Sequence, residues 1–186
     1  MEETIRQQEQ DKNIDAPPEK EEPRTNVGGD DLFGAVISLD ALLEKVPGEN
    51  HDLIRKAYDT AQHGHAGQKR ISGEPYINHP LNVASYLADL NLDDYTIAAG
   101  LLHDVLEDTS MTKEDLVERF PEPVPHLVQG VTKISRINFQ TNREAQIENL
   151  RIMILAMARD IRVVIIKLCD RLHNMKTLEH LPAEKR

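Results

Sequence analysis

An apolar stretch near the middle of the chain, residues 98–109, constrains the fold most, because ionisable side chains interrupt it. Its alanines and leucines predict a buried helix, yet His103, Asp104, Glu107 and Asp108 fall within six positions. Burying a carboxylate or an imidazole without a partner costs several kcal/mol, comparable to the whole stability of a small domain. Residues three and four apart share a helix face, so these groups would project together and could bind a cation. The alternative is a helix end whose acids face water, and the segment alone does not separate the two.

The composition excludes several classes of protein. With 186 residues the chain is long enough for one domain with a substantial core. No stretch approaches the roughly 18 uninterrupted apolar residues of a membrane span, and no basic segment precedes an apolar run at the start, so we expect neither a membrane partner nor an export signal. The single cysteine, Cys169, has apolar neighbours, which predicts a buried thiol and fits the cytoplasm. A net charge of −10 and 4% aromatic residues argue against direct nucleic-acid binding.

The first 31 residues differ from the rest of the chain. They hold ten acidic and four basic residues, three prolines and almost nothing apolar. Such a segment buries too little surface to offset the entropy of ordering it. The sequence therefore predicts a disordered acidic tail over residues 1–31 and a single domain over residues 32–186.

Within that domain, apolar residues recur at spacings of three and four, which is typical of helices. A helix capped near Asp93-Asp94 runs into the central stretch, and the others are expected at 37–46, 51–66, 79–90, 112–120, 124–134, 143–158 and 160–178. No alternating strand pattern appears, so the sequence predicts an all-α domain. Residues 135–143 are polar and aperiodic, and we expect a mobile loop there.

The last predicted helix has two distinct faces. Asp170, Asn174 and Thr177 share one of them, a carboxylate, an amide and a hydroxyl suited to one metal bond followed by hydrogen bonds to a substrate. The alternative is a solvated stripe on an amphipathic helix. The other face carries an apolar stripe that we expect to be buried: Val164, Ile165, Leu168, Leu172 and Met175.

Potential metal ligands occur at three places along the chain. His79 follows a turn-rich loop, the His103-Asp104 pair comes 24 residues later, and Asp170 lies in the last helix. Two imidazole nitrogens and two carboxylates suit a divalent transition ion, with manganese, iron and zinc all compatible. Magnesium would prefer fewer imidazoles.

These four ligands resemble, in order and spacing, the H…HD…D signature of the HD phosphohydrolase superfamily. Over residues 50–186 the chain is also similar to the hydrolase domain of RelA/SpoT-type alarmone enzymes. The motifs that carry this second resemblance are Gly67-Gln68-Lys69-Arg70, Ser72-Gly73-Glu74-Pro75-Tyr76, His79-Pro80, Leu102-His103-Asp104, Glu107-Asp108-Thr109, Gly130-Val131-Thr132-Lys133, Lys167-Leu168 and Asp170-Arg171-Leu172-His173-Asn174-Met175.

The resemblance implies an HD-domain helical bundle that acts in the stringent response. The family hydrolyses guanosine 3′,5′-bis(diphosphate), or its pentaphosphate form, to GDP or GTP and pyrophosphate with Mn²⁺. By position, Glu107 and Asp108 would position and activate the attacking water. The metal ligands would be His79, His103, Asp104 and Asp170, and the nucleotide contacts would be Arg70, Ser72, Asn174 and Thr177.

Two positions depart from the family pattern. Many relatives have Lys where Ile71 stands, and Ala where Cys169 stands. Replacing alanine by cysteine in a core is a small change. The side chain of Ile71 could cover the face of a base, but it could not donate a hydrogen bond to a phosphate. Local positive charge could come from Lys69, Lys133 and Arg136.

We also expect the chain to be a fragment of a longer bifunctional protein with C-terminal synthetase and regulatory domains, although a standalone hydrolase is the alternative. Two other functions stay open at this point. One is an HD phosphohydrolase acting on another nucleotide, and the other is a non-catalytic alarmone-binding module.

Overall fold

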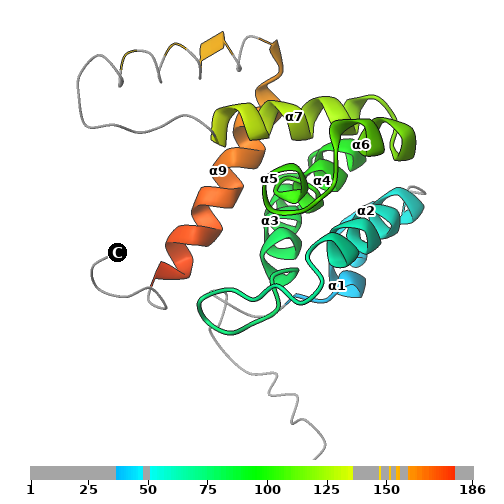
Figure 1. The fold of residues 1–186 in the computed structure, drawn as a ribbon, viewed down its shortest axis with the longest axis vertical. Helices are drawn as coiled ribbons and strands as arrows, with labels where there is room; N and C mark the ends of the chain where they lie inside the picture. Colours follow the sequence, from blue (N-terminus) through cyan, green and yellow to red (C-terminus); the bar gives the residue numbers. More distant parts are fainter. Residues whose placement is uncertain are drawn as a thin grey trace, which may run out of the picture. The chain divides into compact units, whose positions relative to one another are not determined.

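The computed structural model describes residues 37–47, 51–135, 147, 151, 154, 155 and 159–178. Over this part of the chain the prediction of an all-α domain is confirmed, and the extended contacts amount to one isolated bridge between Lys69 and Pro75. No helix among the described residues is long and apolar enough to cross a membrane. The helices in Figure 1 are α1 (Leu39–Lys45), α2 (His51–Gly64), α3 (Asn78–Asp89), α4 (Asp94–Leu101), α5 (Val105–Asp108), α6 (Lys113–Arg119), α7 (Pro123–Ser135) and α9 (Ile161–Lys176).

Helix α4 lies at the centre of the bundle, where it packs against α2, α3, α7 and α9 (Figure 1). All of its residues from Thr96 to Leu101 are buried. Gly100 is required for this packing, since a Cβ placed there would run into the side chain of Leu87 on α3. The central helix is therefore apolar and close to its neighbours, which leaves the site groups at its end surrounded by protein.

Side-chain caps start several helices, including the one predicted to begin near Asp93. Asp93 accepts a hydrogen bond from the backbone N–H of Thr96 and caps α4, and Thr112 forms a capping box with Asp115 at the start of α6. Arg162 on α9 donates to Asp93 at 3.2 Å. This ion pair ties the beginning of α9 to the beginning of α4.

The prediction of one continuous helix through the central stretch is wrong. Helix α4 ends at Leu101, a turn spans residues 102–104, and α5 begins at Val105. The ring Nδ1 of His103 lies 2.8 Å from the carbonyl oxygen of Gly100, the acceptor that a continuing helix would offer to the backbone N–H of Asp104. His103 and Asp104 therefore project from a turn instead of a helix face.

The predicted apolar stripe of α9 is also largely wrong. Val164 is buried and Ile165 partly buried, but the stripe's other members, Leu168, Leu172 and Met175, are exposed. The buried face instead combines apolar residues with two polar groups: Val163, Val164, Ile166, Cys169, Asp170 and His173. The polar groups are buried because other helices supply partners for them, and these partners cannot be seen in the periodicity of α9 alone. The prediction of a buried thiol at Cys169 is confirmed, and burial raises its pKa to about 11.

Some predictions fall outside the described residues. They are the acidic tail over 1–31, the loop after Ser135 and most of the helix expected over 143–158. Ile147 and Ile154 of that helix are described, and both are exposed.

We expect Gly100→Ala to lower the free energy of unfolding by about 1 to 2 kcal/mol. Overpacking against Leu87 lowers the free energy of unfolding by up to about 3 kcal/mol, and the better helix propensity of alanine raises it by roughly 1 kcal/mol. Urea unfolding of the two single variants and the double variant with Leu87→Ala would measure the effect. If the effects of the two substitutions on the free energy of unfolding simply add, the contact between these positions is not the cause of the destabilisation.

Candidate active site

The loop between α2 and α3, residues 65–77, folds back on itself to present side chains towards α9. The backbone N–H of Arg70 donates to the carbonyl of Glu74 at 3.0 Å. Gly73 has a φ of 89°, in the left-handed region that favours glycine, and it sits at the turn. This turn sets the direction of Arg70 and places Tyr76 just before the start of α3.

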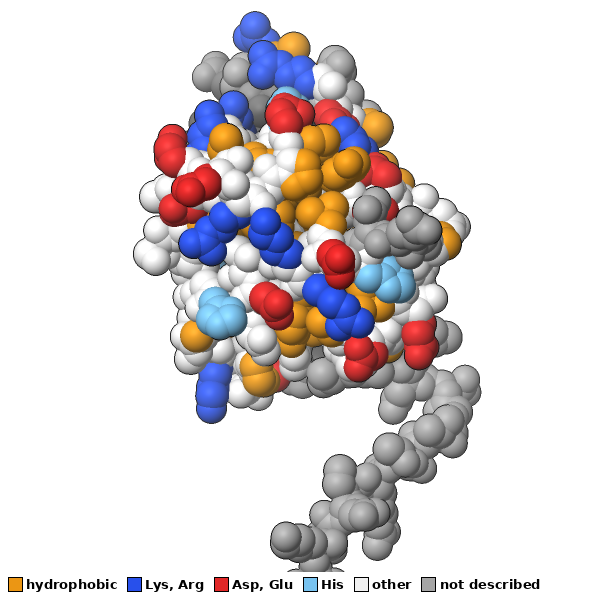
Figure 2. Space-filling view, turned by 90° about the vertical axis from the view of Figure 1, so that its right-hand side faces the viewer, with side chains coloured by type: hydrophobic (Ala, Val, Ile, Leu, Met, Phe, Trp, Pro, Cys, Tyr) orange, Lys and Arg blue, Asp and Glu red, His pale blue; other side chains and the backbone are white. Residues whose placement is uncertain are grey.

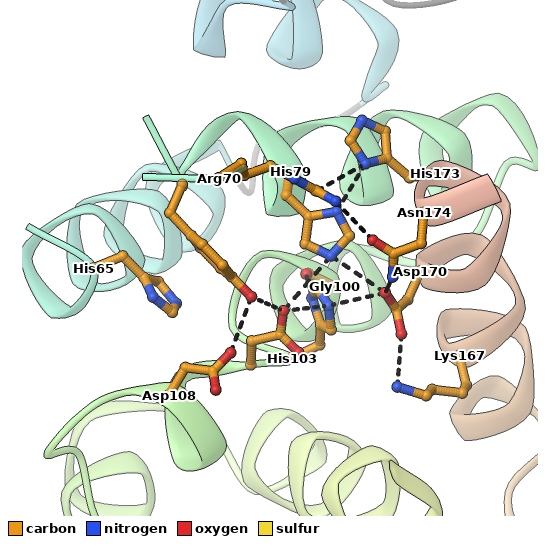
Figure 3. Close-up of polar contacts among 12 residues, drawn as sticks. His65, Arg70, His79, Gly100, His103, Asp108, Lys167, Asp170, His173 and Asn174 are labelled. Atoms are coloured by element: carbon orange, nitrogen blue, oxygen red, sulfur yellow. Dashed lines mark hydrogen bonds and ion pairs between the residues drawn. The ribbon is translucent and has the colours of Figure 1, made fainter. Parts of the chain in front are cut away.

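Four of the predicted site residues converge from three parts of the fold. His79 comes from the first turn of α3, His103 and Asp104 from the turn between α4 and α5, and Asp170 from α9. The Nε2 atom of His79 lies 3.2 Å from Asp170 Oδ1 and 3.6 Å from Asp104 Oδ2, and the Nε2 atom of His103 lies 3.0 Å from Asp104 Oδ2. Figure 3 shows His79, His103 and Asp170 pointing towards one another. The predicted metal ligands therefore lie together in space.

The protonation of His103 indicates which kind of group this cluster can bind. Its Nδ1 faces the carbonyl oxygen of Gly100, which can only accept, so Nδ1 carries the proton and Nε2 presents a lone pair. The ring is fully buried, and Nε2 has no hydrogen-bond partner among the described residues. A buried lone pair facing the carboxylates of Asp104 and Asp170 calls for a cation between them. A backbone carbonyl that orients a ring in this way is a usual support for a metal-binding histidine.

The carboxylates of the cluster are held in their charged form. Burial would raise the pKa of Asp104, but the imidazoles of His103 and His79 and the hydroxyl of Tyr76 hold it below its usual range. Burial would also raise the pKa of Asp170, and the positive charges of His103 and Lys167 lower it. Burial likewise disfavours a charged His103, yet the facing carboxylates raise its pKa, so a proton can supply the positive charge when no ion is bound.

The set His79, His103 and Asp170 offers ligand atoms that all lie within 4.8 Å of one another. Asp104 adds a carboxylate oxygen 3.0 Å from His103 Nε2. Two nitrogens and two oxygens at these separations fit a divalent ion of the transition series. The residues present therefore fit a metal.

Tyr76 links a predicted metal ligand to a predicted catalytic residue. Its hydroxyl lies 2.8 Å from Asp104 Oδ2 and 2.9 Å from Asp108 Oδ2, and its ring stacks on His65 with centroids 4.4 Å apart. Burial and the two carboxylates raise its pKa well above the usual range, so the phenol stays protonated and donates. One O–H donates to one carboxylate at a time, which makes Tyr76 a shared donor.

The second predicted catalytic residue, Glu107, lies on α5 one residue before Asp108, and both are exposed. Partial burial and the charges of Asp104 and Asp108 raise the pKa of Glu107, while Ser135 and the positive charge of Lys167 oppose the shift. A carboxylate with a raised pKa accepts a proton more readily, which suits a general base.

All four residues predicted to contact a nucleotide line one cleft of about 480 Å³ beside the His/Asp cluster: Arg70, Ser72, Asn174 and Thr177. Arg70 Nη2 donates to Asn174 Oδ1 at 2.8 Å and contacts Thr177 Oγ1 at 3.4 Å, so the expected polar ladder of α9 does meet the loop. Ile71 also lines the cleft and is 64% exposed, which leaves its side chain free to meet a ligand.

Positive charge gathers in the cleft although the protein is acidic. Lys69, Arg70 and Lys167 line it. Lys133, which we expected to contribute, lines a separate cavity beside Gln129 and Arg159, and Arg136 lies outside the described residues. On the face drawn in Figure 2, acidic and basic side chains are interspersed, without the single-sign field of a nucleic-acid surface.

Three residues that the structure places at the site have no role that is predicted from the sequence. Tyr76 joins Asp104 to Asp108, Lys167 donates to Asp170 Oδ2 at 2.6 Å, and His173 contacts His79. Lys167 and His173 stand three residues on either side of Asp170. That helical spacing from a predicted ligand is a signal that could have found them.

Comparison with known proteins identifies the family. A sequence model described as "HD domain" matches residues 57–186, which is most of the chain. The chain belongs to the HD domain family. The helical fold and the converging His and Asp residues agree with this membership.

Several relatives carry names that state an activity. The chain is 51% identical over 142 residues to the GTP pyrophosphokinase of Myxococcus xanthus, with 75% of this chain and 19% of that protein covered. It is 49% identical over 150 residues to the bifunctional (p)ppGpp synthase/hydrolase SpoT of Escherichia coli K12, with 80% of this chain and 21% of that protein covered. It is 56% identical over 126 residues to the guanosine-3′,5′-bis(diphosphate) 3′-pyrophosphohydrolase of Haemophilus influenzae, with 68% of this chain and 19% of that protein covered. The chain thus spans about a fifth of the length of these relatives.

A solved structure supports the same grouping. It belongs to a metazoan orthologue of SpoT described as hydrolysing ppGpp and acting in starvation responses. The likeness has a TM-score of 0.55 at 29% sequence identity and covers 72% of this chain and 76% of that one.

We expect the chelator-treated protein to bind one divalent transition ion, with an affinity that falls as the pH is lowered. The ion and a proton compete for Nε2 of His103, whose pKa the facing carboxylates raise. Isothermal titration calorimetry with Mn²⁺ between neutral and mildly acidic pH would measure this.

Asp170→Asn should weaken binding at least about 10-fold, since it removes one carboxylate charge from the cluster. Asp52→Asn, at an exposed position of α2, is the matched control and should bind like the parent. Equal affinities in the two variants would contradict a metal site at this cluster.

Proposed function

We propose that this chain removes the 3′-pyrophosphate from guanosine 3′,5′-bis(diphosphate), or from its pentaphosphate form, giving GDP or GTP, with Mn²⁺ as its ion. The observation that carries the proposal is the position of Arg70, Asn174 and Thr177 in one cleft with His79, Asp104 and Asp170. A metal centre and a basic anion-binding wall in one cavity suit the hydrolysis of a phosphorylated nucleotide. The printed names of the relatives point to this substrate.

The residues that would hold the ion are His79, His103, Asp104 and Asp170. When bound, it lowers the pKa of a water ligand and offsets charge on the phosphate oxygens. The mixed nitrogen and oxygen set is compatible with manganese, which is the ion that the family resemblance implies. Lys167 neutralises the second oxygen of Asp170, so Oδ1 faces the cluster.

The chain's own groups move the proton and orient the phosphates. Glu107, with its raised pKa, takes a proton from the attacking water, and Asp108 helps to position that water. Tyr76 holds Asp104 and Asp108 in a fixed relation by donating to either carboxylate. Arg70 and Lys69 supply positive charge to the phosphates.

The reaction breaks the bond between the ribose 3′ oxygen and the nearest phosphorus. The water oxygen ends on the departing pyrophosphate, and the ribose recovers its 3′ hydroxyl. Ser72, Asn174 and Thr177 hydrogen-bond the nucleotide, and Ile71 covers part of it with an apolar surface.

The full-length protein contains C-terminal synthetase and regulatory domains and works in the cytoplasm. The length of the relatives supports this part of the proposal, because the chain covers 21% of the bifunctional SpoT protein. We assign the hydrolase domain to residues 32–186, and the acidic sequence of residues 1–31 precedes it.

Pyrophosphate release from guanosine 3′,5′-bis(diphosphate) with Mn²⁺ tests the activity. We expect Asp104→Ala and Glu107→Ala to lower kcat by about 100-fold or more, since one loses a metal ligand and the other the general base. Glu114→Ala, an acid in the first turn of α6, should match the parent. Release from other nucleotides but not from this one would indicate another HD phosphohydrolase, and release from none would indicate a binding module.

We expect Ile71→Lys to lower KM for the same substrate by about 3- to 10-fold at low salt. An ammonium at this exposed position on the cleft wall can reach a phosphate that isoleucine cannot contact. Steady-state kinetics at low and high ionic strength would show the gain shrinking with salt. Ile71→Met keeps an apolar side chain and should leave KM unchanged, and a salt-independent gain would contradict the explanation.

A further inference from the structure

His173 lies behind the metal cluster, without lining the cleft. It is buried on α9, three residues after Asp170. Its Nδ1 lies 2.8 Å from Nδ1 of His79 and 3.2 Å from Nη1 of Arg70, and its ring centroid is 4.9 Å from that of His79. Figure 3 shows the ring of His173 at one end of this network, with dashed lines from its nitrogen towards His79 and Arg70.

The contact with Arg70 settles the proton positions. A guanidinium is always protonated and can only donate, so Nδ1 of His173 is an acceptor. The Nδ1 of His79 faces the same atom, so it must be the donor. His79 therefore carries its proton on Nδ1 and presents a lone pair from Nε2.

His79 has an alternative that would close the metal site. Its Nε2 lies 3.2 Å from Asp170 Oδ1, so a proton on Nε2 would form a hydrogen bond between these two proposed ligands. That bond would occupy both ligand atoms at once. The acceptor on His173 favours the other tautomer, which leaves Nε2 and the Asp170 carboxylate open to a cation.

We propose that His173 is a positioning residue that holds His79 in the tautomer required for metal binding, with Arg70 fixing the acceptor role of His173. The inference rests on the proposed function, because it takes His79 as a ligand of the ion. It also connects the cleft wall to the metal site, since Arg70 contacts Asn174 and Thr177 through its other nitrogen. Nucleotide binding in the cleft then changes the affinity of the cluster for the metal ion, and metal binding changes the affinity of the cleft for the nucleotide.

Metal affinity and tautomer, measured on the whole chain without nucleotide, test this role. His173→Phe keeps a ring in the core but removes the acceptor, and His173→Asn offers an amide oxygen close to the position of Nδ1. We expect His173→Phe to weaken Mn²⁺ binding about 10- to 100-fold, a usual effect of losing such a support, and His173→Asn to restore most of the affinity. Calorimetry on chelator-treated protein gives both values.

Long-range nitrogen–proton NMR correlations of the metal-free protein report the His79 tautomer directly. The parent and His173→Asn should carry the proton on Nδ1, and His173→Phe should shift it to Nε2. Arg70→Met should produce a mixture of the two, although no hydrogen bond joins Arg70 to His79 among the described residues. A purely structural effect of these substitutions would not move this proton.

The inference is wrong if folded His173→Phe, judged by its circular dichroism and Tm, binds Mn²⁺ like the parent or keeps the proton on Nδ1. It is also wrong if His173→Asn loses as much affinity as His173→Phe, because packing would then be the cause. Neither readout uses hydrolysis. A parent that binds Mn²⁺ without releasing pyrophosphate would therefore overturn the proposed reaction and leave the inference about His173 standing.

Discussion

The site depends on the hydrogen bond between His103 Nδ1 and the carbonyl of Gly100. The bond occupies an acceptor that the backbone would otherwise use, so α4 stops and the chain turns. It also orients the ring of His103 with its lone pair towards Asp104 and Asp170. Local structure and chemistry have one cause here, because the interaction that ends the helix is the one that prepares a ligand. The packing around α4 excludes water from this ring, which makes its unpaired nitrogen costly without a cation.

Much of the fold could be predicted from the sequence. Helix starts depend on side chains within three or four residues, such as Asp93 with Thr96 and Thr112 with Asp115, and the predicted starts near residues 93 and 112 are confirmed. The break after Leu101 could not be predicted, because it depends on a side chain that competes with the backbone only when the ring is buried. The identities of the converging residues could be predicted from motif and spacing, but spacing carries no information about distances between α3 and α9.

The errors on α9 have a common physical origin. Periodicity assigns apolar residues to the core, yet Asp170 and His173 are buried while Leu168 and Met175 are exposed. The free-energy cost of burying Asp170 and His173 is offset by polar partners from α3, from the turn after α4 and from the loop that carries Arg70. Such an offset is a property of the assembled bundle. A polar ligand face and an apolar core face cannot be told apart from one helix when the partners come from elsewhere.

Helix α9 and its C-cap residue carry on one face the proposed metal ligand Asp170, the residue proposed to hold the tautomer of His79, and two proposed nucleotide contacts. A straight helix moves as one body, so a small rotation about its axis would displace all of these groups together. Substitutions at the buried positions Val163 and Ile166, where α9 meets the rest of the bundle, would therefore be pleiotropic and alter ion and nucleotide binding at once. During evolution these two properties would change as a linked pair, and tuning one without the other would require substitutions outside α9, such as at Ile71 on the loop.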